Sequence, residues 1–118
     1  MENRFDSLFG AFQIETLAGF ERRDELISVP GVDAVMIGPA DLSISLGIPG
    51  EFENPKLIDA IDKIIATCNK HGVAPGIHMR PLHLAKFWRD RGMRFLSTGG
   101  DALFLYDKAS EAVKTLRD

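Results

Sequence analysis

Four short apolar segments, each followed along the chain by a helix-forming segment, constrain the fold of this sequence more than any other feature. The apolar segments span residues 8–15, 33–38, 74–79 and 93–99, and the helix-forming segments span 19–28, 54–72, 81–92 and 100–118. Strands that alternate with helices in this way predict a parallel sheet with right-handed crossover connections. We therefore expect an α/β fold made of four βα units.

The helix predicted over residues 54–72 has the strongest local signals. Asn54 is suited to cap its N-terminus, Pro55 to its first position and Gly72 to its C-terminal stop. Apolar side chains recur between these ends at helical spacing, as Leu57, Ile58, Ile61, Ile64, Ile65 and Cys68. The segment before this helix, from residue 39 to 53, is expected to be a long loop that presents an acid, Asp41, at the end of a strand.

Length sets a second limit on the architecture. The chain has 118 residues, 45% of them hydrophobic and 26% charged, which is typical of one globular domain. We expect a single domain over residues 1–118, with an irregular start at residues 1–8. A closed barrel of eight βα units needs about 250 residues, so four units make either half of such a barrel or a small open sheet.

Charge and cysteine content exclude several classes of function. The net charge is −3 and no basic stripe is present, so we expect no nucleic-acid partner. No apolar run reaches the roughly 20 residues of a membrane span, and residues 1–10 lack the pattern of a signal peptide. Cys68 is the single cysteine, so no intrachain disulfide can form, and we expect a reducing, cytoplasmic setting.

The C-terminal ends of the four predicted strands are the places to search for a site, because parallel α/β folds bind ligands there. Polar, glycine and titratable residues occur at each of these ends. They are Gln13 and Glu15, then Gly38, Ala40 and Asp41, then His78 and Arg80, then Ser97, Gly99, Gly100 and Asp101.

Two interpretations of these strand ends remain open from the residues alone. Glu15 and Asp41 could share a Mg²⁺ or Mn²⁺ ion, or Glu15 could cap a helix while Asp41 closes a turn. The backbone N–H groups of Ala40, Asp41 and Leu42 could bind a carboxylate, or the glycine and proline there could serve turn shape alone. His78 could contact a substrate. Arg80 could pair with an anion or remain solvated.

Four motifs give the sequence a family resemblance. The segments QIET at 13–16, VPGVDAVMIGPADLSISLG at 29–47, KHGVAPGIH at 70–78 and STGGDALFL at 97–105 resemble the C-terminal half of the metal-dependent HpcH/HpaI aldolases. The resemblance implies a (β/α)₈ TIM-type barrel, a divalent metal ion (Mg²⁺ or Mn²⁺) held by Glu15 and Asp41, and a pyruvate pocket that includes Gln13. It also implies that the turn from Gly38, through the amides of Ala40 and Asp41, receives the pyruvate carboxylate.

The resemblance implies a lyase that cleaves a hydroxy-oxo acid to pyruvate and an aldehyde. The family's proton-transfer histidine and its enolate-binding arginine belong to motifs that these residues do not match, so we assign no catalytic residue. We therefore expect activity only where a further copy or a complementary half-barrel completes the site. The alternative is a non-catalytic half-barrel that binds metal or a small carboxylate. In both cases we expect a homo-oligomer, because an open parallel edge invites association.

Overall fold

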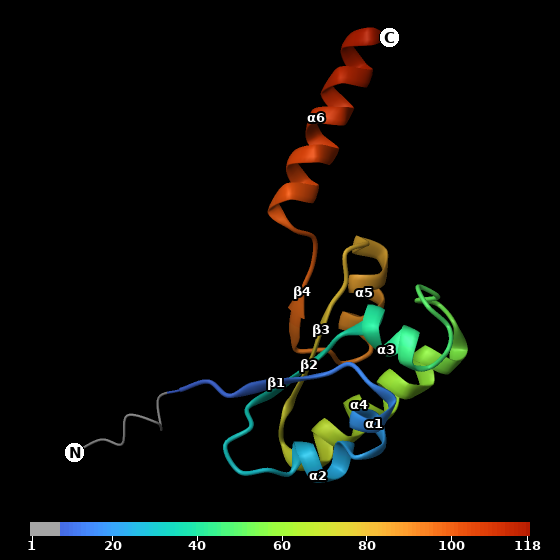
Figure 1. The fold of residues 1–118 in the computed structure, drawn as a ribbon. Helices are drawn as coiled ribbons and strands as arrows, with labels where there is room; N and C mark the ends of the chain where they lie inside the picture. The colour runs from blue at the N-terminus through green and yellow to red at the C-terminus, as the bar shows by residue number, and fades with distance from the viewer. Residues whose placement is uncertain (1–7) are drawn as a thin grey trace, which may run out of the picture.

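The computed structural model describes residues 8–118 and contains one four-stranded parallel sheet (Figure 1). Its strands, in spatial and sequence order, are β1 (Ala11–Ile14), β2 (Ala34–Ile37), β3 (Ala74–His78) and β4 (Phe95–Ser97). All three neighbouring pairs are parallel, which confirms the predicted α/β fold of four βα units. Apart from Leu8, the start at residues 1–8 that was predicted to be irregular lies outside the described residues.

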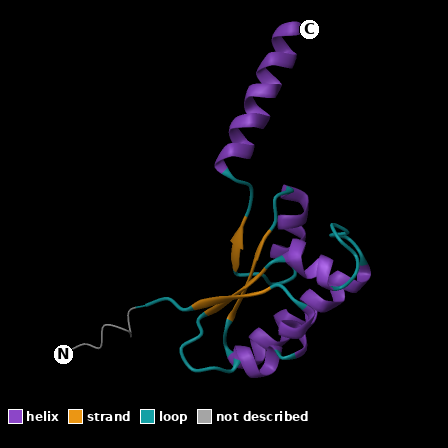
Figure 2. Ribbon diagram, in the orientation of Figure 1, coloured by secondary structure: helices purple, strands orange, loops and turns teal. Residues whose placement is uncertain are grey.

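Six helices connect and follow these strands. They are α1 (Leu17–Glu21), α2 (Arg23–Ile27), α3 (Pro39–Ser45), α4 (Pro55–His71), α5 (Leu82–Asp90) and α6 (Asp101–Arg117). The ends of α4 are as predicted, since the Asn54 side chain accepts a hydrogen bond from the Lys56 N–H and Gly72 takes a left-handed φ of 68°. Figure 2 shows α1 to α5 gathered to one side of the strands.

Two predicted elements are wrong, each for a local reason. The expected loop at 39–53 begins with helix α3, because Gly38 is extended and Pro39 has the φ that a first helical position needs. The helix expected at 19–28 is two short helices that part at Arg22, and the first is capped by Thr16, whose hydroxyl accepts a hydrogen bond from the Gly19 N–H.

The hydrophobic core lies between the sheet and α4. Side chains of the strands alternate, so that Ile14, Val35, Ile37 and Ile77 are fully buried beneath the helices. Helix α4 covers them with a continuous apolar face, made of Leu57, Ala60, Ile61, Ile64, Ile65 and Cys68. Trp88 of α5 is also fully buried and extends this core toward β4.

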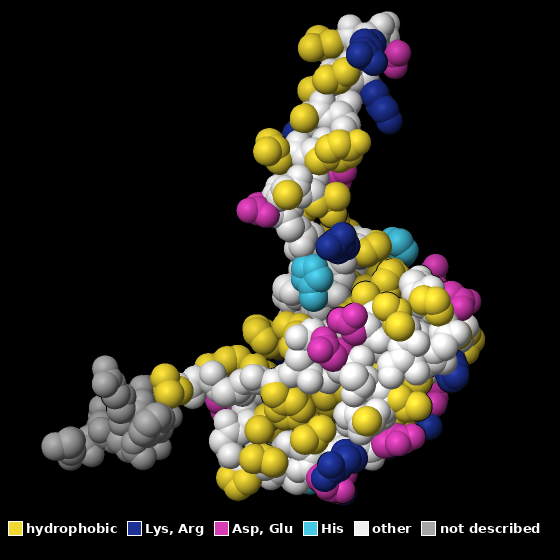
Figure 3. Space-filling model, in the orientation of Figure 1, with side chains coloured by type: hydrophobic (Ala, Val, Ile, Leu, Met, Phe, Trp, Pro, Cys, Tyr) yellow, Lys and Arg dark blue, Asp and Glu magenta, His cyan; other side chains and the backbone are white. Residues whose placement is uncertain are grey.

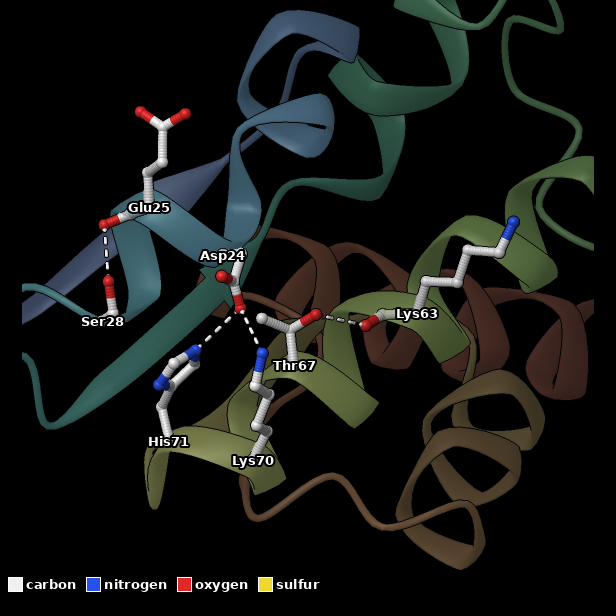
Figure 4. Close-up of polar contacts among 7 residues, drawn as sticks. All are labelled: Asp24, Glu25, Ser28, Lys63, Thr67, Lys70 and His71. Carbon is white, nitrogen blue, oxygen red and sulfur yellow. Dashed lines mark hydrogen bonds and ion pairs between the residues drawn. The ribbon is translucent and has the colours of Figure 1, made fainter.

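An exposed polar cluster joins α2 to the last turn of α4 (Figure 4). Asp24 accepts hydrogen bonds from His71 Nε2 at 2.8 Å and from Lys70 Nζ at 3.1 Å. Hydrogen bonding to His71, and next to Lys70, lowers the pKa of the Asp24 carboxyl. His71 lies in the last turn of a helix, a position where the helix dipole favours a positively charged side chain.

Among residues 8–118, no helix covers the opposite face of the sheet (Figure 2). Alanines form one row across this face, where Ala34 pairs with Ala11 on one side and Ala74 on the other, and Met36 lies in the next row between Gln13 and Gly76. Gly76 lies on the same face, and a β-carbon built there would be 2.6 Å from the Phe95 carbonyl oxygen and 2.9 Å from that of Val35. In the barrel interpretation of the fold, this face is the interior.

Helix α6 stands away from the rest of the molecule (Figure 1). None of its residues is buried, and Leu105, Tyr106 and Leu116 are among the most exposed hydrophobic side chains. The radius of gyration, 17.2 Å, accordingly exceeds the roughly 13–14 Å of a compact domain of this length. Within residues 8–118, none of the helices combines the length and apolar character that crossing a bilayer requires.

Candidate functional site

The end of β1 and the start of the segment after β2 lie against each other at the C-terminal edge of the sheet. The Gly38 N–H donates to the Ile14 carbonyl at 3.0 Å, which extends the ladder one step beyond the two strands. A β-carbon on Gly38 would lie 2.8 Å from Gln13 Nε2 and 3.3 Å from Glu15 Oε2. The side chains of Gln13 in β1 and of Glu15 just after it therefore both lie next to Gly38.

Helix α3 places Asp41 beside this point. Asp41 lies in the first turn of the helix, three residues beyond Gly38. Buried Ser43 fixes that turn, since its hydroxyl donates to the Ala40 carbonyl at 2.6 Å and accepts from the Gly50 N–H at 3.0 Å. The Asp41 carboxylate thus projects from a short helix whose geometry is set by a buried hydroxyl.

The backbone N–H groups of this turn differ in what they bind. The Leu42 N–H donates to the Gly38 carbonyl at 2.9 Å, so the prediction that it would be available to a ligand is wrong. Within residues 8–118, the N–H groups of Ala40 and Asp41 find no protein acceptor. Two adjacent donors therefore remain for an anion, in place of the expected three.

A cavity of about 410 Å³ opens at this edge. Its walls carry Gln13, Gly38, Ala40 and Asp41 on one side and His78 and Arg80 on the other. Glu15 does not line the cavity, but its carboxylate lies next to Gly38, which does. Four of the five predicted site residues therefore line one cavity, and the fifth lies beside one of these four.

Glu15 and Asp41 do not take the structural roles that were the alternative to metal binding. Thr16, and not Glu15, caps the following helix. Among the described residues, neither the Glu15 nor the Asp41 carboxylate accepts a hydrogen bond or forms an ion pair, so Asp41 closes no turn. Two half-exposed or exposed carboxylates without protein partners remain at the site.

These side chains offer a divalent cation only part of its coordination shell. Within residues 8–118, no three His, Cys, Asp or Glu side chains come together in a way that could hold a metal ion. Two carboxylates beside an amide, with the other positions left to water and substrate, fit a hard ion such as Mg²⁺ or Mn²⁺. The donor set therefore suits an ion that binds together with a chelating ligand.

The third and fourth strand ends add a fixed imidazole. His78 Nδ1 lies 2.8 Å from Ser97 Oγ, which links the ends of β3 and β4. His83 is exposed on α5 and His71 binds Asp24 of α2, so neither belongs to the site.

Phe52 also lines the cavity, from the loop between α3 and α4. Nothing in the sequence pointed to Phe52, because it belongs to no strand end.

Comparison with known proteins agrees with the fold and the motifs. The model of the HpcH/HpaI aldolase/citrate lyase family matches residues 5–107. A 4-hydroxy-2-oxo-heptane-1,7-dioate aldolase of Escherichia coli is 36% identical over 108 residues, which are 92% of this chain and 41% of that protein. A hydroxypyruvate/pyruvate aldolase of Paraburkholderia phytofirmans is 32% identical over 105 residues, 89% of this chain and 40% of that protein.

Solved structures of similar proteins show the same fold as this chain. The HpcH/HpaI aldolase from Desulfitobacterium hafniense superposes with a TM-score of 0.90 at 34% identity, over 98% of this chain and 45% of that one. The four βα units thus correspond to the C-terminal half of a (β/α)₈ barrel, as predicted. The chain spans about 40% of the length of the curated relatives it matches.

Proposed function

Because the chain belongs to the HpcH/HpaI aldolase/citrate lyase family, we propose that it provides the metal-binding and oxo-acid-binding half of a carbon–carbon lyase. The reaction is the cleavage of a hydroxy-oxo acid into pyruvate and an aldehyde. The observation that carries the proposal concerns two carboxylates without a hydrogen-bond or ion-pair partner among residues 8–118: Asp41 lines the cavity, and Glu15 lies next to Gly38, which lines the same cavity. Relatives of this chain are aldolases, which favours this chemistry over other uses of such a pair.

Glu15 and Asp41 would hold the divalent ion. When bound, Mg²⁺ or Mn²⁺ supplies a Lewis acid that stabilises the negative charge developing as the carbon–carbon bond breaks. Glycine at position 38 is needed because a methyl group there would occupy the space next to the Glu15 carboxylate.

The remaining groups bind and orient the substrate. The free N–H groups of Ala40 and Asp41 would donate to the carboxylate of the oxo acid, which needs no cationic side chain for this purpose. The Gln13 amide, held over Gly38, would donate to an oxygen of the same oxo acid. These donors fix the bond to be cleaved in one orientation relative to the carboxylate pair.

Proton transfer is not assigned to any residue of this chain. We propose that a second polypeptide segment, from another copy or a complementary half-barrel, covers the open face of the sheet and supplies it. The exposed apolar side of α6 and the open edges at β1 and β4 support a homo-oligomer. The buried, single Cys68 is in keeping with a cytoplasmic setting.

Pyruvate release from a 4-hydroxy-2-oxo acid tests the proposal. We expect the rate to require Mg²⁺ or Mn²⁺ and to be lost in Glu15→Gln and in Asp41→Asn, while Glu53→Gln, an exposed carboxylate outside the cavity, keeps the wild-type rate. A rate that survives both site substitutions, or that needs no divalent ion, would contradict it. Metal-dependent binding of pyruvate without turnover would favour the alternative, a non-catalytic half-barrel. We keep this alternative because the chain spans only about 40% of the length of these relatives.

A further inference from the structure

Both outer edges of the sheet are unpaired, and their strands run in the same direction. Among residues 8–118, no strand lies beside the outer edge of β1 or of β4. The Gly10 carbonyl accepts a hydrogen bond from the Ala34 N–H of β2. Because the backbone groups of successive residues in a strand point to opposite sides, those of Ala11 and Gln13 face outward. The outer edge of β1 therefore offers a row of donors and acceptors to a further parallel strand.

The stagger of the sheet shows how far it has curled toward closure. A row of paired residues runs across it from Gln13 through Met36 and Gly76 to Phe95. The ring of Phe95 nevertheless contacts that of Phe9, which lies four residues before Gln13, with 5.5 Å between the ring centroids. The rows thus shift by about four residues from one edge strand to the other, half of the shear of about 8 that closes an eight-stranded barrel.

We propose that a second copy of this chain closes the sheet into an eight-stranded barrel, with β4 of each copy beside β1 of the other. This names the partner that covers the open face, and it rests on the proposed function only for the chemistry of the completed site. Two copies supply the eight strands and the whole shear, around one two-fold axis that makes both seams identical. The chain matches 45% of a solved barrel protein with a TM-score of 0.90, which leaves space for one more unit of its own size.

The outward backbone groups of β4 give the register of each seam. The Ser97 carbonyl accepts the Met79 N–H, so the backbone groups of Leu96 and Thr98 face outward. A shift of about four residues per copy brings Ser97 beside Ala11 of the second copy. In that register the second copy's Ala11 donates its N–H to the Leu96 carbonyl, and its carbonyl accepts the Thr98 N–H. The stagger and the alternation of backbone groups therefore agree on one register.

The open face presents apolar side chains that a second copy buries. Phe9 and Phe95 are 63% and 39% exposed, and their rings meet at the N-terminal end of this face. Figure 3 shows hydrophobic side chains at the surface between the start of β1 and the base of α6. Beyond this pair, the alanine row and Gly76 offer the interior only short side chains or none. The second copy brings the same aromatic pair to the barrel axis, where eight strands leave room for side chains to fill.

Closure also brings the two copies together at the carboxylate pair. Two residues beyond Ser97 and Ala11, the same register places Gly99 beside Gln13 of the second copy. The glycine-rich segment between β4 and α6 then forms a wall next to the second copy's Glu15. Each barrel accordingly holds two sites, and each site combines the carboxylate pair of one copy with the β4 end of the other.

Disulfide trapping tests this register directly. Neighbouring residues in a row of a sheet have α-carbons about 5 Å apart, within the range that a disulfide spans. Oxidised Ala11→Cys/Ser97→Cys protein should run as a covalent dimer in non-reducing electrophoresis, and a mixture of the two single variants should form the same dimer. Each single variant alone should stay a single chain, because like positions lie on opposite walls of the barrel. Wild-type protein, with the buried Cys68 as its single cysteine, gives the background.

The matched control moves one cysteine by two residues along β1. Gln13→Cys/Ser97→Cys keeps both side chains on the inward face but out of register, and should cross-link about tenfold more slowly or less. Circular dichroism of the reduced variants shows whether each one folds, and the mixture of single variants replaces a double variant that does not. No covalent dimer from the pair or the mixture, or equally fast cross-linking out of register, would overturn the proposal. An associated protein that does not cross-link here joins through another surface, which overturns it as well.

Pyruvate release separates this proposal from the proposed function. A cross-linked barrel that releases no pyruvate would leave the interface in place and count against the lyase function alone. Pyruvate release from protein that light scattering shows to be a single chain would overturn the closed barrel and leave the lyase function standing.

Discussion

At Gly38 the backbone lies so close to the side chains of Gln13 and Glu15 that a methyl group added there would displace them. The neighbouring atoms are the amide nitrogen of Gln13 and the β-carbon and carboxylate of Glu15, at 2.8, 3.1 and 3.3 Å from a built β-carbon. The φ of Gly38 is −94°, a value open to any residue, so contact and not backbone strain makes glycine necessary. The proposed site therefore requires a residue without a side chain at position 38 as much as it requires the two carboxylates.

Substituting Gly38 by alanine should weaken Mn²⁺ binding about tenfold, a loss comparable to that from disturbing the groups that orient metal ligands. The physical reason is displacement of the Glu15 carboxylate by the new methyl group. Calorimetric titration with Mn²⁺ measures it. Gly100→Ala is the matched control, because Gly100 is extended and a β-carbon there meets nothing within 4 Å. Unchanged affinity in Gly38→Ala would show that Glu15 is not a ligand from this position.

The sequence was sufficient to bring the candidate residues at the strand ends together. Gln13, Gly38 and Asp41 line one cavity because parallel strands bring their C-terminal ends to one edge of the sheet. The sequence could not show that the Leu42 N–H is unavailable to a ligand, or that Phe52 lines the cavity. The first follows from α3, which uses that donor internally, and the second from a loop whose path is set only by tertiary packing.

At the scale of elements, the middle of the sheet leaves no room for side chains on its inner face at Gly76. A β-carbon there would meet backbone oxygens of both neighbouring strands, at 2.6 Å from Phe95 and 2.9 Å from Val35. Backbone atoms in a ladder cannot move aside as a flexible side chain can. The spacing of β2, β3 and β4 therefore depends on this glycine.

Gly76→Ala should lower the free energy of unfolding by about 2 kcal/mol or more, the cost of overpacking a well-packed site. Urea denaturation followed by far-ultraviolet circular dichroism measures the loss. Gly100→Ala, on extended backbone in open space, should change it far less. Equal stability of the two variants would mean that the strands can separate at no cost.

The contact of α2 with α4 predicts a pH effect. The pKa of the Asp24 carboxyl is lowered in the folded state by hydrogen bonds to His71 and Lys70, from an ordinary value of 3.8. Its contribution to stability is therefore complete above pH 3.8 and is lost as the pH falls through the lowered folded-state pKa. In Asp24→Asn, stability should fall less steeply with acidification in this range.

Acid unfolding at low ionic strength measures the effect, which should be small because the cluster is exposed, and smaller still in added salt. Glu53→Gln, which replaces an exposed carboxylate that forms no ion pair among the described residues, is the control and should keep the wild-type slope. An unchanged slope in Asp24→Asn at low salt would show that the cluster does not hold α2.

Elements were predicted best where local and tertiary signals agree. The strands and α4 were found because their apolar periodicity, caps and glycine stop all indicate the same boundaries. Helix α3 was missed because its seven residues are too few to show a period beside Gly-Pro. The break at Arg22 was missed because the apolar residues on either side suggest one continuous helix.

At the scale of the whole molecule, the chain has one covered and one open face, with α6 apart from both (Figures 1 and 2). Helix α6 is amphipathic, with Leu105, Ala109, Val113 and Leu116 on one side and Asp107, Glu111 and Lys114 on the other. Within the described residues none of its side chains is buried, which the sequence pattern alone could not show. A periodic helix predicts burial, but the partner that buries it need not belong to the same chain.

Leu105→Glu should shift the protein from an oligomer toward a monomer at micromolar concentration, because the substitution places a charge in the exposed apolar side of α6. Size-exclusion chromatography with light scattering gives the mass. Lys114→Glu, on the polar side of the same helix, should leave the mass unchanged. A wild-type protein that is already a monomer would contradict the proposed homo-oligomer.

Binding of Mn²⁺ to a double-mutant set, followed by electron paramagnetic resonance in the presence of pyruvate, tests the central claim most directly. The set is the wild type, Glu15→Gln, Asp41→Asn and the double variant. If the two carboxylates share one ion, each single substitution should remove most of the affinity, and the double variant should lose little more, since coupled residues do not act additively. Wild-type affinity in either single variant, or losses that simply add, would show that Glu15 and Asp41 do not hold one ion.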